Sequence, residues 1–295
     1  MFSSVKRLHF IGIGGIGMSG IAEILLSQGF KISGSDLSQS EVTDHLAKLG
    51  ATIHIGHDEK NVEGADVVVY SSAVKQMDNP EMRAAIAKKI PTIRRAEMLA
   101  EVARLTYCLG VAGTHGKTTT TSMSALVMMK AGIDPTVIVG GKLRGLGGSN
   151  ARLGAGDWTV VEADEFDRSF LQLQPTIAVI TNVEEDHLDI YTGLDDIKNA
   201  FVEFANKVPF YGLVVACIDD KGVRDILPRI KKRILTYGLS PHADVRARHI
   251  TFKNLSSHST IYIHGKAIGE LTLNIPGRHN IKNALAAVAV AHSLG

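Results

Sequence analysis

Short apolar runs alternate with amphipathic stretches along most of this chain. The pattern predicts strands at Arg7–Ile13, Lys31–Ser35 and Asp66–Tyr70. It predicts helices through Ile21–Ser27 and Pro80–Lys89. Strands and helices that alternate in this way form βαβ units around a parallel sheet. We therefore expect the first part of the chain to be a Rossmann-like domain.

A second series of alternating elements follows a helical pattern at Arg95–Arg104. It opens with a strand at Thr106–Val111 and a helix that runs through Lys130. Later strand patterns lie at Trp158–Glu162, Ile177–Thr181, Leu213–Ala216 and Ile234–Tyr237. The alternation predicts a second α/β domain with a parallel sheet.

The pattern changes after Pro241 to shorter, alternating segments. These segments are Val245–Phe252, Thr260–His264 and Ile268–Leu273, and a helix follows at Asn280–Ser293. Alternation of apolar and polar positions is typical of antiparallel strands. We therefore expect an antiparallel section at the end of the second sheet.

A length of 295 residues fits two domains, and the fold class is α/β. We assign residues 1–105 to a Rossmann-like parallel-sheet domain. Residues 106–295 are then a P-loop ATPase-like α/β domain with an antiparallel section.

Composition and charge exclude several classes of protein. The net charge is +2 and the positive charges are scattered, so neither a nucleic-acid nor a membrane partner is expected. Cys108 and Cys217 each lie in an apolar stretch, which indicates buried thiols in a reducing compartment. No apolar run approaches the length of a membrane span. These features predict a cytoplasmic protein, which we expect to be a monomer or a weak homodimer.

Glycines recur directly after the first predicted strand. Gly12, Gly14 and Gly17 form the spacing G-x-G-x-x-G before a helix, and Asp36 closes the next strand. Glycines at this spacing let backbone N–H groups approach a diphosphate at the helix N-terminus. The loop predicts a diphosphate site, with a packing turn as the alternative.

A second glycine loop, Gly113–Thr118 (GTHGKT), also joins an apolar strand to a helix. Lys117 is expected to reach the β- and γ-phosphates of a nucleotide, and Thr118 to offer its hydroxyl to Mg²⁺. The strict spacing of this motif requires glycine at Val111, and the sequence has it one position earlier, at Gly110. Two phosphate loops in one chain indicate two different nucleotides, whereas a dehydrogenase needs only one.

Carboxylates follow two of the later strands. Glu162, Asp164 and Glu165 come at the end of one strand, and residues 184–189 (EEDHLD) follow the next. Ligands bind at the carboxyl ends of strands in open α/β sheets, and Mg²⁺ prefers oxygen ligands. We therefore expect a Mg²⁺–ATP site in which Glu162 binds the metal and His187 either joins it or orients a water.

Taken together, these segments resemble the Mur ligases of bacterial peptidoglycan synthesis. The stretches that carry the resemblance are Ile11–Gly20, Ser33–Asp36, Ser71–Val74, Arg94–Leu99, Gly113–Thr120, Glu162–Glu165, Asp186–Asp189 and Pro276–Ala287. They extend from one end of the chain to the other and are jointly highly specific.

The resemblance implies a role for each matching position. For the UDP-sugar these are Gly14, Gly15, Gly17, Asp36, Ser71, Ser72 and Arg94. For ATP they are Gly113, Thr114, Gly116, Lys117, Thr118 and Thr119, with His279, Asn280 and Asn283 at the adenine. The implied metal ligands are Thr118, Glu162 and His187. The implied catalytic residues are Lys117, His187 and His115.

The family couples ATP to amide-bond formation, and the details favour its alanine-adding branch. That implies Mg²⁺, ATP, L-alanine and UDP-N-acetylmuramate as the reactants, with an acyl-phosphate intermediate. Several sister ligases carry a carbamylated lysine where this sequence has Phe201, and its absence fits the alanine-adding branch. The family's third domain, which supplies amino-acid contacts, is absent from these 295 residues, so we expect nucleotide binding with little or no turnover.

Three alternatives remain open at this point. A related ligase that attaches a whole peptide to the same UDP-sugar uses much the same motifs. A Rossmann NAD-dependent oxidoreductase would account for the first glycine loop and leave Lys117 and Thr118 unexplained. A nucleotide-binding module without catalysis is the third.

Overall fold

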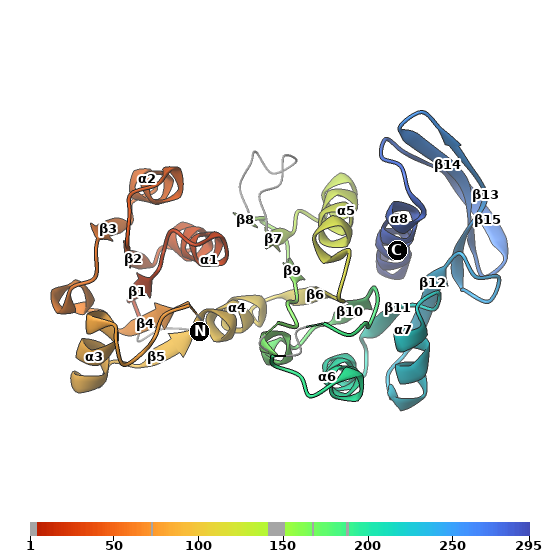
Figure 1. Cartoon of the computed structure of the whole chain (residues 1–295). Helices are drawn as coiled ribbons and strands as arrows, with labels where there is room; N and C mark the ends of the chain where they lie inside the picture. Colours follow the sequence, from red (N-terminus) through yellow and green to blue (C-terminus); the bar gives the residue numbers. More distant parts are fainter. Residues whose placement is uncertain (1–4, 72, 141–150, 167, 187–188) are drawn as a thin grey trace. The chain divides into compact units, whose positions relative to one another are not determined.

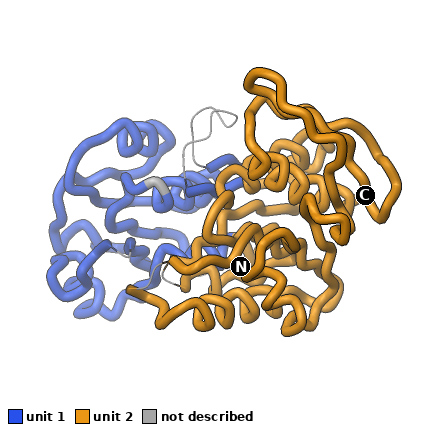
Figure 2. Tube along the Cα trace, turned by 45° about the vertical axis from the view of Figure 1, so that its right-hand side comes forward, with its two compact units in different colours: residues 1–102, 137–153 blue, residues 103–136, 154–295 orange. Residues whose placement is uncertain are grey.

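A computed structural model of the chain divides into two compact units, shown in Figures 1 and 2. The structure describes residues 5–71, 73–140, 151–166, 168–186 and 189–295, without the side chain of Ile16. The first unit comprises residues 1–102 and 137–153, and the second comprises residues 103–136 and 154–295. Each unit has its own sheet, and the two are described separately.

The first unit is built on a five-stranded parallel sheet with the order β3-β2-β1-β4-β5. The strands are β1 Arg7–Ile11, β2 Lys31–Asp36, β3 Thr52–Ile55, β4 Val67–Tyr70 and β5 Thr92–Arg94. The helices of this part are α1 Ile16–Ser27, α2 Glu41–Lys48, α3 Pro80–Ala87 and α4 Arg95–Ala103, with a 3₁₀ turn η1 Glu59–Val62. The strand order reverses between β1 and β4, and ligands bind at such a reversal in open α/β sheets.

Local sequence explains where helices α2 and α3 begin. Ser40 and Thr43 form a capping box at the start of α2. The side-chain oxygen of Asn79 accepts hydrogen bonds from the N–H groups of Glu81 and Met82, and Pro80 is the first residue of α3. The two caps therefore set the first residues of α2 and α3.

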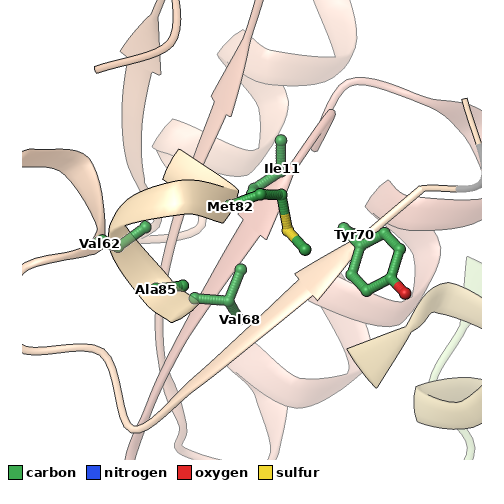
Figure 3. Packing of buried hydrophobic residues seen from close by; sticks show 6 residues of the cluster. All are labelled: Ile11, Val62, Val68, Tyr70, Met82 and Ala85. Atoms are coloured by element: carbon green, nitrogen blue, oxygen red, sulfur yellow. The ribbon is translucent and has the colours of Figure 1, made fainter. Parts of the chain in front are cut away.

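A cluster of buried side chains holds α3 and η1 against strands β1 and β4 (Figure 3). Its buried members are Ile11, Val62, Val68, Tyr70, Met82 and Ala85. Burial of such side chains supplies about 1.5–3 kcal/mol each. The cluster therefore sets the position of α3, and with it the position of Glu81.

The second unit carries a mixed sheet in which the strands follow the order β15-β14-β13-β12-β11-β10-β6-β9. The strands are β6 Tyr107–Ala112, β9 Trp158–Glu162, β10 Ile177–Ile180, β11 Leu213–Cys217, β12 Ile234–Gly238, β13 Val245–Lys253, β14 Ser256–Ile263 and β15 Lys266–Leu273. The helices are α5 Lys117–Lys130, α6 Leu194–Asn206, α7 Lys221–Ile226 and α8 Arg278–Leu294, with 3₁₀ turns η3 Ser169–Gln172 and η4 Leu227–Arg229. Helices α5 and α8 pack together on one side of this sheet, and α6 and α7 lie on the other (Figure 1).

The predicted fold class is confirmed, because the first sheet is parallel and the second is mixed. The antiparallel section is formed by β13, β14 and β15, although β13 pairs in parallel with β12. The sequence analysis assigned no strand to β3 or β5, nor to β7 (Thr136–Ile138) and β8 (Ala151–Arg152), which pair with each other. These strands have two to four residues, too few to show a period.

Both cysteines are free and buried, as predicted. Burial raises the pKa of the Cys108 thiol to about 12 and also raises that of Cys217. Among the described residues, no helix combines the length and the apolar character that a membrane span requires.

Candidate nucleotide-binding sites

The first glycine loop lies between β1 and α1, where the strand order of the first sheet reverses. The N–H groups of Gly12 and Ile13 both donate to the carbonyl oxygen of Ser35, at 2.8 and 3.0 Å. Gly12 has φ +82°, a conformation that glycine adopts without strain. No side chain caps α1 among the described residues, so its first N–H groups can bind an anion.

Asp36 braces this loop from the end of β2. Its Oδ2 accepts a hydrogen bond from the N–H of Gly14 at 2.8 Å, and its Oδ1 accepts one from Leu37 at 2.8 Å. A Cβ atom at Gly14 would lie 2.8 Å from Oδ2, so the hydrogen bond and a side chain cannot coexist there. In this structure Asp36 therefore fixes the shape of the loop.

A cavity of about 680 Å³ opens beside the loop. Four of the residues predicted to bind the UDP-sugar line it, and these are Gly14, Gly15, Asp36 and Ser71. Gly17 instead faces the side chain of Arg95, and Ser72 lies outside the described residues. Arg94 ends β5, where its N–H donates to Glu97, and the residues described around the cavity do not include it.

His57 lines the same cavity and was not identified from the sequence. Its Nδ1 lies 3.1 Å from Oε2 of Glu81 and 3.0 Å from Oγ of Ser35. Glu81 is fully buried and also accepts a hydrogen bond from Asn61 Nδ2 at 2.6 Å and one from Ser35 Oγ at 2.6 Å. A buried carboxylate thus positions one edge of the His57 ring at the cavity wall.

The buried His9 completes this network. Its Nε2 lies 3.6 Å from Oε1 of Glu81, and its Nδ1 lies 2.9 Å from Oγ of Ser33. Burial acts to raise the pKa of Glu81, but the polar contacts from His9, Ser35 and Asn61 outweigh it, and the pKa falls to about 2. Glu81 is therefore ionised at neutral pH inside the first unit.

The second glycine loop lies between β6 and α5. Gly113 has φ +142° and Gly116, the N-cap of α5, has φ +82°. The loop is held from the end of β10, where Thr181 Oγ1 donates to the carbonyl oxygen of His115 at 2.7 Å. Asn182 Oδ1 accepts a hydrogen bond from the N–H of His115 at 2.7 Å. The helix N-terminus and its loop are thus preformed for an anion.

We expect Gly113→Ala to disrupt this loop. A Cβ atom would lie 2.0 Å from Thr181 Oγ1 and 3.0 Å from the backbone nitrogen of Asn182, and φ +142° is unfavourable for alanine. The free energy of unfolding should fall by about 1–3 kcal/mol, and ATP affinity should fall at least about tenfold. Chemical denaturation and calorimetry measure the two effects.

Gly132→Ala is the matched control for this substitution. Gly132 also has positive φ, +78°, but a Cβ atom there would meet nothing within 4 Å. It shares the backbone strain without the clash. Equal ATP affinity in the two variants would contradict the role given to the Gly113 contact.

Lys117 opens α5, and Glu165 is its nearest charged partner. Its Nζ lies 2.8 Å from both carboxylate oxygens of Glu165 and 2.9 Å from the carbonyl oxygen of Gly113. The side chains are 14% and 3% exposed. Burial raises the pKa of the Glu165 carboxyl above its usual range, although the Lys117 ammonium acts in the opposite direction. The sequence analysis placed Glu165 in the acidic cluster but not beside Lys117.

Thr118 and Glu162 come together at the head of α5, as the sequence predicted for a metal site. Thr118 Oγ1 donates to Glu162 Oε1 at 2.9 Å. A hydroxyl and a carboxylate are ligands that suit Mg²⁺, which completes its shell with waters and phosphate oxygens. The third predicted ligand, His187, lies outside the described residues. Among the described side chains, no group of three His, Cys, Asp or Glu converges on a possible metal position.

His115 is exposed on the loop, whereas its neighbour Thr114 is buried. The His115 side chain is 69% exposed, and its Nε2 lies 3.9 Å from Oε2 of Glu184. Thr114 Oγ1 accepts a hydrogen bond from the N–H of Glu184 at 3.0 Å. Thr119 follows in the first turn of α5. The exposed imidazole of His115 is accessible to a substrate.

Helix α8 brings Asn283 to the loop, as its packing on α5 requires. Asn283 is 8% exposed, and a Cβ atom at Gly116 would lie 2.7 Å from its Oδ1. Asn280 Nδ2 donates to the carbonyl oxygen of Pro276 at 2.7 Å. The ring of His279 lies over Gly277, where a Cβ atom would be 2.5 Å from Cε1. Asn283 therefore lies against the second glycine loop, whereas Asn280 and His279 contact residues at the start of α8.

Comparison with known proteins finds two matching family models along the chain. The model of the Mur ligase family, catalytic domain, matches residues 7–107, and that of the Mur ligase middle domain matches residues 111–291. A UDP-N-acetylmuramate–L-alanine ligase of Geotalea daltonii is 55% identical over 294 residues, which is 100% of this chain and 64% of that protein. The corresponding ligase of Geobacter sp. (strain M21) is 56% identical over 294 residues, again 100% of this chain and 63% of the relative.

Two solved structures are similar to this chain over nearly its whole length. One is UDP-N-acetylmuramate:L-alanyl-gamma-D-glutamyl-meso-diaminopimelate ligase from Neisseria meningitides, with a TM-score of 0.89, 32% identity and coverage of 99% of this chain and 94% of that chain. The other is UDP-N-acetylmuramate-alanine ligase from Thermotoga maritima, with a TM-score of 0.85, 32% identity and coverage of 98% and 65%. Both resemble the whole of the chain.

Proposed function

The chain belongs to the Mur ligase family, and from that premise we propose that it serves the ATP-dependent joining of L-alanine to the carboxylate of UDP-N-acetylmuramate. The observation that carries the proposal is the arrangement of Lys117, Thr118 and Glu162 at the head of α5. The choice of amino acid is supported by the 55% and 56% identity to two L-alanine ligases. The chain spans 64% and 63% of the length of these relatives.

In this proposal each unit binds a different nucleotide. The glycine loop and cavity of the first unit hold the UDP-sugar, with the N-terminus of α1 facing the diphosphate. The loop of the second unit holds ATP, with the N-terminus of α5 facing its phosphates. If the chain were an NAD-dependent oxidoreductase, Lys117, Thr118 and Glu162 at the head of α5 would have no role.

The proposed reaction has two steps. The muramoyl carboxylate attacks the γ-phosphorus of ATP, ADP leaves, and the amine of L-alanine then attacks the acyl phosphate and releases inorganic phosphate. Lys117 neutralises the charge that builds on the transferred phosphoryl group. Thr118 and Glu162 would hold Mg²⁺, which when bound neutralises phosphate charge. His115 is exposed on the loop, and in this proposal it contacts the carboxylate substrate.

The peptide-adding ligase is the second candidate, favoured by the TM-score of 0.89 to the Neisseria meningitides structure. Both candidates use the same UDP-sugar, so they differ only in the amine that attacks. A panel of L-alanine, other amino acids and a short peptide separates them, because only the true acceptor accelerates phosphate release. We place either reaction in the cytoplasm, consistent with two free, buried thiols.

Calorimetry with the two nucleotides tests the proposal. We expect the chain to bind UDP-N-acetylmuramate and ATP at separate sites, and the chelation of Mg²⁺ to weaken only ATP binding. Competition between the two ligands for one site would show that the two-site assignment is wrong. NADH serves as the control ligand, and tight binding of NADH would favour the oxidoreductase instead.

A further inference from the structure

The ammonium group of Lys117 has all three of its donors engaged in the structure. Two hydrogen bonds go to the carboxylate of Glu165 and one to the carbonyl oxygen of Gly113, at 2.8, 2.8 and 2.9 Å. An ammonium group has only three protons to donate. A phosphate oxygen can therefore reach Lys117 only if one of these bonds is given up.

The backbone of Glu165 is held by contacts that do not involve Lys117. The hydroxyl of Tyr191 donates to the backbone carbonyl oxygen of Glu165 at 2.6 Å, and the N–H of Arg168 donates to the same oxygen at 3.1 Å. The guanidinium of Arg168 stacks over the Tyr191 ring, 4.8 Å from its centroid, and binds Asp196 at the start of α6. The backbone of Glu165 is thus held in place, and its carboxylate is only 3% exposed.

We propose that Glu165 is a positioning residue that competes with the nucleotide phosphates for the Lys117 ammonium and so limits ATP affinity. The inference rests on the proposed function of the α5 loop. In the absence of nucleotide, the carboxylate occupies the place of a phosphate oxygen and keeps Lys117 at the loop. When the triphosphate binds, the ammonium exchanges one anionic partner for another, and the cost of that exchange lowers the affinity.

Glu165→Gln tests the competition because glutamine keeps the shape and removes the charge. We expect ATP to bind about three- to tenfold more tightly, the range of one exchanged ion pair. Calorimetry with the non-hydrolysable analogue AMP-PNP and Mg²⁺ measures this without turnover. The affinity for UDP-N-acetylmuramate in the first unit should not change.

Glu165→Asp separates competition from simple charge repulsion. Aspartate keeps the charge but is one methylene shorter, so its carboxylate draws back from Lys117. Competition predicts tighter binding of AMP-PNP in this variant too, whereas repulsion by the charge alone predicts none. This more conservative variant also allows the measurement if Glu165→Gln does not fold.

Asp225→Asn is the matched control, because Asp225 forms a comparable ion pair with Lys198 at 2.9 Å between α7 and α6. It should leave AMP-PNP affinity unchanged. Unchanged or weaker AMP-PNP binding in both Glu165 variants would overturn the inference while leaving the proposed function intact. Failure of the unsubstituted chain to bind AMP-PNP at all would overturn both.

Discussion

Lys117→Ala is expected to weaken ATP binding at least about tenfold without affecting the UDP-sugar, and to reduce any phosphate release that the unsubstituted chain shows roughly 10²–10³-fold. The alanine variant removes the positive charge at the N-terminus of α5, which faces the transferred phosphoryl group in the proposed reaction. The first unit carries its own glycine loop and cavity, so its affinity for UDP-N-acetylmuramate should stay unchanged. Calorimetry with each nucleotide and a phosphate-release assay measure the three quantities.

A loss of stability must be separated from the loss of function in this variant. Lys117→Ala also removes the ammonium from the buried carboxylate of Glu165, which should lower the free energy of unfolding by about 1–3 kcal/mol. Adding Glu165→Gln should restore part of that stability and leave phosphate release low. Lys198→Ala, which removes the ammonium of another ion pair in the second unit, is the control; the Lys198 side chain is 15% exposed, close to the 14% of Lys117. If Lys117→Ala weakened UDP-N-acetylmuramate binding as strongly as ATP binding, the two-site assignment would be wrong.

The sequence predicted those parts of the sites that depend on local geometry. Gly12 and Gly113 stand at the ends of strands where the backbone turns into a helix, and both have positive φ in the structure. Glu162 ends β9, and parallel strands present their carboxyl ends at one edge. Its contact with Thr118 therefore follows from the strand pattern and the phosphate motif together.

The contacts that the sequence did not predict join residues far apart in the chain. Glu165 lies 48 positions from Lys117, and Asn283 comes from the C-terminal helix to meet Gly116. Residues 137–140 and 151–153 cluster with the first unit although the flanking segments 103–136 and 154–295 belong to the second. Such contacts depend on the order of strands and the packing of helices, which the periodicity of single segments does not contain.

The contacts around His57 could not be predicted from the sequence for the same reason. His57 follows a four-residue strand, β3, and Glu81 lies in the first turn of α3. Each would be read from the sequence as a solvated polar residue, because glutamate is rarely buried. Only the packing of α3 on the sheet brings the two side chains within 3.1 Å.

Glu81→Ala is expected to lower the free energy of unfolding at pH 7 by about 3–5 kcal/mol, the largest stability effect we predict. The substitution removes the acceptor that Ser35 and Asn61 share and the carboxylate that faces His9. Glu81→Gln keeps the volume and should cost less. Urea denaturation at pH 7 compares the variants. Glu63→Gln, which alters an exposed ion pair with Lys88 in the same unit, should change stability by less than about 1 kcal/mol.

The pH dependence of the unfolding free energy tests whether the negative charge of Glu81 causes its stabilising effect. The pKa of Glu81 is about 2 in the folded chain, below the ordinary glutamate value of 4.5, so its contribution to stability is complete above about pH 5 and is lost as the pH falls toward 2. This difference between the two pKa values corresponds to about 3 kcal/mol of unfolding free energy. The difference in unfolding free energy between the original chain and Glu81→Gln should therefore shrink as the pH falls from 5 to 2. Parallel curves over that interval would mean that Glu81 is not held as a carboxylate by its neighbours.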